Sequence, residues 1–288
     1  MFESDSRKAC SDRALVLHSL TIPYEILTDG QHSMVVVPAQ HLERAKFEIW
    51  QYEQENRPQK LPAPRITPVI QNGVPGVVAY VAVILLVALL AGESAFNRDW
   101  LSAGRVDGAL IRGGEWWRSI TALTLHSGLT HFAGNAGFGA LFGIMAGRVL
   151  GSGVTWLAVV IASSAANLIN TLLLDSSHRA IGASTAVFAA LGLVAGFVWR
   201  GKLMKQDRWP YRIGPIVGGI ALLAYTCTGD ANTDVGAHLS GFVCGFLAGV
   251  IMTYVYRYIP LENVQRASGV LAIAIVILAW LFALRLWA

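Results

Sequence analysis

Four polar side chains stand inside long apolar stretches of this 288-residue sequence: His131, Asn135, Ser184 and His238. Such groups are expensive to place in hydrocarbon, so the ones that occur there are candidates for function. Each alone also has a structural explanation, because a helix serine can bond its own i−4 carbonyl and a histidine or asparagine can join neighbouring helices. Together, these four residues supply the side-chain types that a nucleophilic reaction needs.

The chemistry that these four residues support is nucleophilic acyl transfer. A serine hydroxyl needs a base to take its proton, an imidazole does so near neutral pH, and the resulting oxyanion needs donors aimed at it. Ser184 and His238 fit the nucleophile and the base. His131 and Asn135, one turn apart on one helix face, fit the oxyanion donors, and the backbone N–H of Ser184 at a helix N-terminus adds a favourable dipole.

The composition indicates that a membrane body carries these residues. Hydrophobic residues make up 54% of the chain and charged residues 14%, against about 25% charged in an ordinary soluble domain, which excludes a soluble enzyme. About 20 residues cross a bilayer core of about 30 Å. Stretches free of Asp, Glu, Lys and Arg predict seven spanning helices: 74–92, 131–149, 154–174, 184–199, 213–228, 235–256 and 267–285. The fourth and fifth are short enough to be buried core helices instead.

The four polar side chains share one depth in these helices. Measured from the inner ends of the helices at about 1.5 Å per residue, they lie about 20 to 27 Å up, in the outer third of the bilayer. Residues that only joined helices together would not need to agree in height. The shared depth therefore favours a common site.

Basic residues are concentrated in alternate connections between the predicted helices. Residues 200–212 hold five of them, whereas residues 227–234 hold none. By the positive-inside rule this predicts a cytosolic N-terminus and an outer C-terminus; the long connection 93–130 is weakly governed by that rule. The bases lie between apolar runs and do not alternate with aromatics in a patch, so the net charge of +4 does not indicate nucleic-acid binding.

The N-terminal part differs in charge from the rest of the chain. Residues 1–72 hold 9 acidic and 8 basic residues, which leaves 9 acidic and 14 basic ones for the 216 that follow. Periodicity predicts a small cytosolic α/β domain over residues 1–60, with a Pro-rich linker at 61–73. The expected order of its elements is helix, strand, strand, helix, over residues 11–20, 24–28, 33–37 and 39–56.

Four short segments make the sequence resemble a known family, the rhomboid intramembrane serine proteases. The resemblance covers roughly residues 74–256, and its motifs follow in the family's order: EWWR (115–118), HFAGN (131–135), GASTAVF (182–188) and GAHLSGFVCG (236–245). It implies a catalytic dyad of Ser184 and His238, with oxyanion contacts from His131 and Asn135. The implied activity is cleavage of transmembrane segments of other membrane proteins near their outer end.

The resemblance also implies supporting roles. Trp117 and Arg118 are expected to be structural in the interfacial loop, Gly182 to form the tight entry to the serine helix, and Phe188 to lie against the catalytic imidazole. One departure is Thr185, which replaces the family's frequent glycine after the nucleophile and could crowd the approach of the scissile bond.

The fold that the resemblance implies is an all-α polytopic membrane protein with a six-helix core. The extra segment 267–285 looks like the family's six-plus-one variant, and we expect it to lie apart from the motif set. We expect an integral protein of a bacterial inner membrane whose partners are transmembrane substrates and the lipid bilayer. The spans hold no HEXXH or paired carboxylates and the chain has no P-loop or dinucleotide fingerprint, so we expect no metal and no cofactor.

Several alternatives stay open at this point. A catalytically inactive rhomboid-like protein would bind membrane clients without cutting them, although Ser184 and His238 are intact. A transporter would need polar groups at half the depth of the bilayer on broken helices, whereas the four polar residues here lie nearer one side. Asp234 could orient His238 as a third catalytic residue, but the favoured explanation is that it caps the helix that carries His238. His126 and His178 lie in predicted loops and are expected to be solvated or interfacial.

Overall fold

The structure is a computed structural model with two compact units, residues 1–64 and 65–288, each described here by itself. The placement of the chain is described for residues 2–4, 7–29, 32–56, 71–201, 213–214, 216–219, 221–222 and 234–285. The predicted helix 213–228 therefore lies mostly outside the described residues.

The N-terminal unit packs two helices on a three-stranded antiparallel sheet. The helices are α1 (Arg7–Ser19) and α2 (Leu42–Glu55), and the sheet order is β1 (Phe2–Ser4), β3 (His32–Val36), β2 (Glu25–Asp29). Strand β1 was not among the elements expected from the sequence. The core of the unit is small, since the buried hydrophobic residues that cluster there are Cys10, Leu17, Ile22, Val35 and Ala45.

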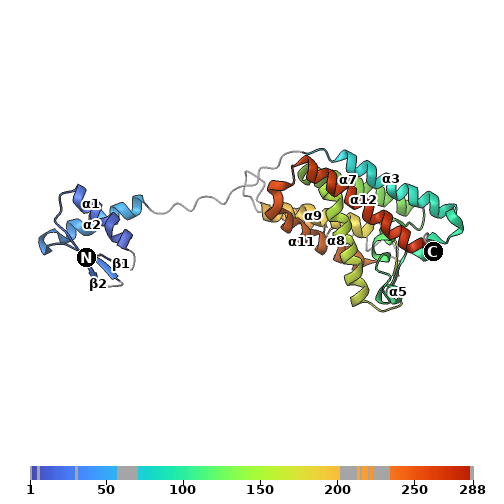
Figure 1. Ribbon diagram of the computed structural model, residues 1–288, viewed down its shortest axis with the longest axis horizontal. Helices are drawn as coiled ribbons and strands as arrows, with labels where there is room; N and C mark the ends of the chain where they lie inside the picture. The colour runs from blue at the N-terminus through green and yellow to red at the C-terminus, as the bar shows by residue number, and fades with distance from the viewer. Residues whose placement is uncertain are drawn as a thin grey trace. The chain divides into compact units, whose positions relative to one another are not determined.

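The second unit is a bundle of long helices (Figure 1). Five helices of its described part are long and apolar enough to cross a membrane: α3 (Val74–Gly92), α8 (Ser152–Leu173), α9 (Ser184–Gly201), the stretch Val235–Tyr258 that contains α11 (Val235–Val255), and α12 (Glu262–Leu284). Helix α7 (Leu129–Leu150) is as long as α8, but it also carries the polar residues His131, Asn135 and Arg148. A mostly helical membrane protein is thus what the sequence folds into.

Helix α9 lies at the centre of this bundle. In its most apolar stretch of 18 residues, 78% are buried inside the protein, compared with 22% in the corresponding stretches of α3 and α12. It packs against α7, α8 and α11. A helix surrounded by other helices need not match lipid around its circumference, so its N-terminus can carry a polar residue away from the acyl chains.

Glycines set the close approach of α9 and α11. A Cβ at Gly245 would overlap the carbonyl oxygen of Ala189, and one at Gly192 would overlap that of Phe242. A Cβ at Gly241 would stand 2.6 Å from the carbonyl oxygen of Thr185. Small residues spaced four apart on both helices therefore let the two backbones touch, which brings the first turns of α9 and α11 together.

We expect Gly245→Ala to destabilise the protein by about 1–3 kcal/mol, because the added methyl forces α9 and α11 apart. The matched control is Gly137→Ala, since a Cβ at Gly137 meets nothing within 4 Å and both changes raise helix propensity equally. Thermal unfolding in detergent measures the difference. Equal melting temperatures for the two variants would contradict this account of the packing.

The connection between α3 and α7 is a folded loop of short helices. Its elements are the 3-10 turn η2 (Ala95–Asn97), α4 (Trp100–Gly104), β4 (Val106–Asp107), α5 (Gly108–Arg112), α6 (Arg118–Thr121) and the 3-10 turn η3 (Ala122–Thr124). Strand β4 pairs with β5 (Arg179–Ala180), which ties this loop to the segment before Ser184.

Arg118 lies at the centre of that loop. Its side chain is 6% exposed and donates to Glu115 Oε2 at 2.6 Å and to the carbonyl oxygens of Ser102 (2.8 Å) and Arg105 (3.1 Å). A buried guanidinium needs such partners, because an unpaired charge away from water is strongly unfavourable. Arg118 therefore joins the start of α6 to the end of α4.

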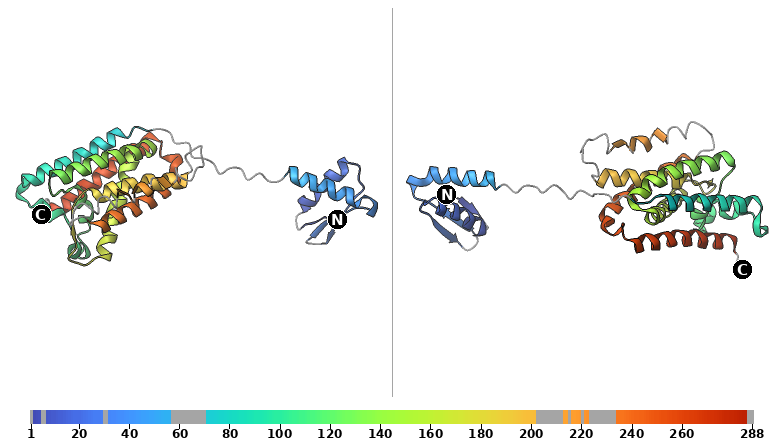
Figure 2. Two further views of the ribbon diagram at one scale, coloured as in Figure 1. Left: turned by 180° about the vertical axis from the view of Figure 1, so that it is seen from behind. Right: turned by 90° about the horizontal axis from the view of Figure 1, so that it is seen from above.

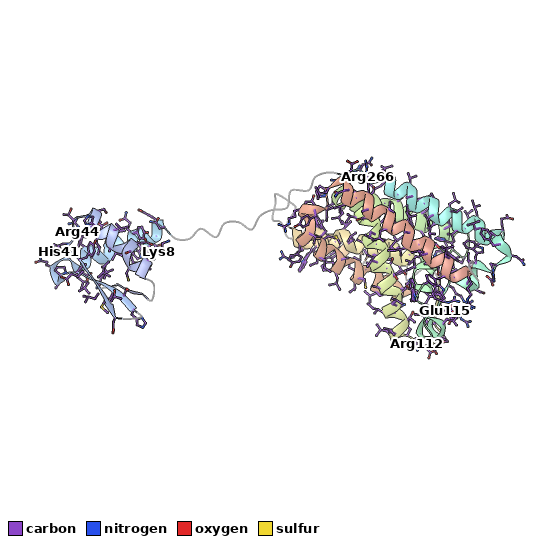
Figure 3. All side chains as sticks on the ribbon, viewed as in Figure 1. Lys8, His41, Arg44, Arg112, Glu115 and Arg266 are labelled. Atoms are coloured by element: carbon purple, nitrogen blue, oxygen red, sulfur yellow. The ribbon has the colours of Figure 1, made fainter. Side chains whose placement is uncertain are left out.

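Helix α12 runs along one side of the bundle and reaches the same loop (Figure 2). Its Phe282 ring stacks on Trp117 at 5.6 Å between centroids, and Arg285 just after it lies 3.6 Å from Glu115. Glu115 thus lies at the opposite end of α12 from Arg266 (Figure 3). The expectation that the extra helix lies apart from the motif set was wrong, because its C-terminal end packs on the EWWR segment.

Candidate active site

Ser184 is the first residue of α9, at the centre of the bundle. Two residues earlier, Gly182 has φ of +131°, a conformation that favours glycine, and its N–H donates to the carbonyl oxygen of Ala122 at 2.9 Å. A Cβ at Gly182 would stand 2.8 Å from His131 Nε2 and 3.6 Å from Ser184 Oγ. Glycine is thus required here for both backbone and space, and His131 and Ser184 flank it.

His238 lies in the first turn of α11 and is 6% exposed. Its imidazole stacks on the ring of Phe188, with centroids 4.6 Å apart and planes at 21°. Because Phe188 is one turn after Ser184 on α9, this stacking holds the imidazole beside the N-terminal turn of the serine helix. No hydrogen bond joins Ser184 to His238 in the described part of the chain; such bonds are often long before substrate binds.

His131 lies in the first turn of α7, with its two ring nitrogens in different surroundings. Nδ1 lies 3.1 Å from Ser127 Oγ and accepts from the Ser127 N–H at 3.5 Å. When Nδ1 accepts, a neutral imidazole carries its proton on Nε2. Nε2 is the atom beside Gly182, so this tautomer directs an N–H donor toward the start of α9.

Asn135 follows one turn later on α7 and is 6% exposed. Its backbone carbonyl accepts from Tyr80 Oη at 2.9 Å, whereas its side-chain Nδ2 is buried without a partner among the described residues. A buried donor left unpaired costs about 1–3 kcal/mol. Such a group is explained when a ligand oxygen completes its bonding.

Thr185, next to the nucleophile candidate, faces α11. It is 4% exposed, and its methyl carbon would lie 3.2 Å from a Cβ at Gly241. The larger residue at this position therefore fills part of the contact between α9 and α11, where the glycine at 241 leaves room for it.

Asp234 caps α11. Its Oδ1 accepts from the Ala237 N–H at 2.9 Å, and its Oδ2 lies 3.0 Å from His178 Nε2, without the alignment of a hydrogen bond. The capping explanation of Asp234 is the one that the structure supports, and its contact with His178 links the start of α11 to the loop before Ser184. No hydrogen bond to the ring of His238 is present in this part of the described chain.

If the site cleaves transmembrane segments, we expect Asp234→Asn to leave the rate of that cleavage within about threefold of wild type, because asparagine caps helices as well as aspartate does. Asp234→Ala should lower stability by about 1 kcal/mol, since the cap is lost. Turnover and melting temperature measured side by side separate the two variants. A loss of activity in Asp234→Asn as large as that in His238→Ala would instead assign the carboxylate a catalytic role.

Two further residues contact His131, although the sequence did not assign either of them to the site. Ser127 was not singled out, although its position four residues before His131 places it within reach of that ring. His126 was expected to be solvated or interfacial, but its two ring nitrogens are buried and its ring packs on His131 with centroids 5.3 Å apart. Burial and then the neighbouring His131 lower the pKa of His126 to about 4, so its ring is neutral at pH 7.

Among the residues that the structure describes, no three His, Cys, Asp or Glu side chains are grouped to hold a metal ion.

Comparison with known proteins points to one family. The family model described as Rhomboid domain matches residues 113–255, which include all four of the candidate residues named at the outset. Rhomboid protease GluP of Bacillus subtilis (strain 168) is 29% identical over 191 residues, which cover 64% of this chain and 36% of that protein. Putative rhomboid protease YdcA of the same organism is 33% identical over 141 residues, 48% of this chain and 67% of that protein. Rhomboid-like protease 1 of Toxoplasma gondii is 27% identical over 146 residues, 49% of each chain. The match thus spans little more than a third of the first of these relatives.

Proposed function

Because this chain belongs to the rhomboid family, we propose that it is an intramembrane serine endopeptidase with Ser184 as nucleophile and His238 as general base. Family members named as proteases support the activity at the level of the family. The observation that carries the assignment to these residues is their convergence: His238 stacks beside the first turn of α9 and His131 lies against Gly182, two residues before Ser184.

The proposed reaction follows from the groups around Ser184. The Ser184 hydroxyl attacks the carbonyl carbon of the scissile bond while the imidazole of His238 takes its proton. The oxyanion that forms accepts hydrogen bonds from the Asn135 amide, His131 Nε2–H and the Ser184 N–H, which are donors in place before the reaction begins. His238 then gives the proton to the leaving amine, and water hydrolyses the acyl-enzyme by the same steps.

The substrate that fits this site is a transmembrane segment of another protein, cut near its outer end. Ser184 begins α9 and therefore lies at one end of the central helix. A peptide bond inside an intact helix hides its carbonyl carbon, so the segment must unwind locally. Small or helix-weakening residues at the cut position make that unwinding easier.

Within the proposal, α3 to α11 with the helix predicted at 213–228 form a six-helix catalytic core, and α12 is an additional seventh span. The N-terminal unit is then a small cytosolic α/β domain joined by a linker. The presence of both Ser184 and His238 favours a protein that cuts over the alternative, a rhomboid-like protein that only binds clients.

We expect a reporter fused after Gly229 to appear on the outer side of the membrane and one fused after Lys205 on the inner side, because the bases cluster in the connection 200–212. A thiol-labelling or phosphatase assay in whole cells reads this directly. Both fusions on the same side would mean that the segment 213–228 does not cross.

The test of the proposed function is reaction of the full chain with a fluorophosphonate, which modifies activated serines. We expect one adduct, located on Ser184 by mass spectrometry, and none in Ser184→Ala. An adduct on another serine, or none in a folded wild-type sample, would overturn the proposal.

A further inference from the structure

Helix α12 makes a buried polar contact with the segment that precedes α7. Trp280 Nε1 donates to Thr124 Oγ1 at 3.0 Å, and the two residues are 7% and 5% exposed. The rest of α12 has few buried side chains, namely Ala272, Ala279 and Leu284. Among the described side-chain hydrogen bonds of α12 this one is buried, whereas those of Gln265 near the start of the helix are partly exposed. It is a specific feature, because apolar packing alone would not require a donor at position 280.

Trp280 is held in place by its own neighbours. Its ring lies 4.6 Å from that of Trp100, and a Cβ at Gly104 would stand 2.5 Å from its Cη2. The carbonyl of Gly104 accepts from Thr121 Oγ1 at 2.7 Å, and Thr124 Oγ1 in turn donates to the Thr121 carbonyl at 2.7 Å. The indole, the glycine and the two threonines thus form one buried network.

This network reaches the candidate site by two short routes. The carbonyl of Ala122 accepts the N–H of Gly182, two residues before Ser184. On the other side, Leu125 packs in the cluster that contains Trp280 and is followed by His126, whose ring lies against His131. The segment 121–126 therefore touches the loop of the nucleophile at one end and an oxyanion donor at the other.

We propose that Trp280 of the additional helix is a positioning residue for the site: its indole N–H holds Thr124, and with it the segment that sets Gly182 and His131 relative to Ser184. This inference rests on the proposed function. Small displacements of reacting groups reduce rates strongly, so a hydrogen bond far from substrate acts on turnover and leaves substrate binding nearly unchanged. Helix α12 is then part of the catalytic architecture, although it carries none of the motif residues.

The decisive variant is Trp280→Phe, which keeps an aromatic ring on Trp100 and removes the donor to Thr124. We expect kcat for cleavage and the rate of fluorophosphonate labelling to fall together by about 5- to 20-fold, with KM within about twofold. The matched control is Trp100→Phe in the same cluster, which keeps an aromatic ring against Trp280 and leaves the bond from Trp280 to Thr124 in place. The indole N–H that it removes donates to the Ala95 carbonyl, outside the segment 121–126. Trp100→Phe should lower the melting temperature by a similar amount but change the labelling rate less than twofold.

Changes at Thr124 test the same bond from the other side. Thr124→Ser keeps the hydroxyl and should label at near wild-type rate. Thr124→Val removes the acceptor of the indole N–H and also the bond to the Thr121 carbonyl, so it should label at least as slowly as Trp280→Phe. The double variant Trp280→Phe with Thr124→Val should be no slower than Thr124→Val alone, because the bond to the indole is already lost there. If Trp280→Phe does not fold, the Thr124 pair decides alone.

Failure of the positioning role can be distinguished from failure of the proposed function. A wild-type chain that reacts with the probe, together with Trp280→Phe or Thr124→Val reacting equally fast, overturns the positioning role and leaves the proposed function standing. A folded wild-type chain that never reacts overturns the proposed function and this inference with it.

Discussion

Ser184→Ala is expected to abolish cleavage of a transmembrane substrate while the protein stays folded and inserted in the membrane. Ser184 begins α9 and is only partly buried, so loss of its hydroxyl leaves the packing of the bundle unchanged. His238→Ala should lower the rate to the same background, because removing either half of a nucleophile and base pair costs nearly as much as removing both. Purified protein in detergent or vesicles, assayed with a labelled substrate, gives the rates.

The control for this pair is Ser163→Ala on α8. Ser163 is fully buried and its hydroxyl donates to the carbonyl of Val159 in its own helix at 2.6 Å. It should therefore keep near wild-type turnover, since such back-bonding adds little to helix stability. Retained cleavage in a purified Ser184→Ala sample would contradict the assignment of the dyad. So would a double variant, Ser184→Ala with His238→Ala, that cleaves more slowly than both single variants.

Asn135→Ala is expected to lower kcat by about 10²- to 10³-fold with KM nearly unchanged, because an oxyanion donor acts mainly in the transition state. The structure adds an expectation on stability. Asn135 Nδ2 has no partner among the described residues, so its removal breaks no hydrogen bond of the folded protein. The melting temperature should therefore stay at or slightly above that of wild type.

The opposite result would follow if Asn135 only joined helices. Bonds between membrane helices are worth about 0.6 kcal/mol on average, so that role predicts earlier melting with normal turnover in the cold. Asn135→Leu is the matched control for size, since it keeps a branched side chain of about the same shape, removes the N–H donors and adds no charge. A variant Asn135→Ala that melts early and cleaves at the wild-type rate would leave the oxyanion to His131 and the Ser184 N–H.

The amino-acid sequence by itself determined the family and the residues of the candidate site. Polar side chains are costly in hydrocarbon, so His131, Asn135, Ser184 and His238 stand out against their apolar surroundings without any knowledge of the fold. The apolar runs also predicted the long helices that the structure describes, because the length needed to cross a bilayer is a local property of the chain. Capping of α11 by Asp234 was equally readable, since an N-cap bond joins residues three apart.

Only the tertiary structure decided how these residues are supported. The bond between Trp280 and Thr124 joins residues 156 positions apart, and the stacking of Phe282 on Trp117 spans a comparable distance in the chain. No periodicity encodes such pairs, because a helix pattern reports which side is apolar and not which neighbour covers it. For this reason the sequence predicted α12 as a span, whereas only the tertiary structure shows its contact with the EWWR segment.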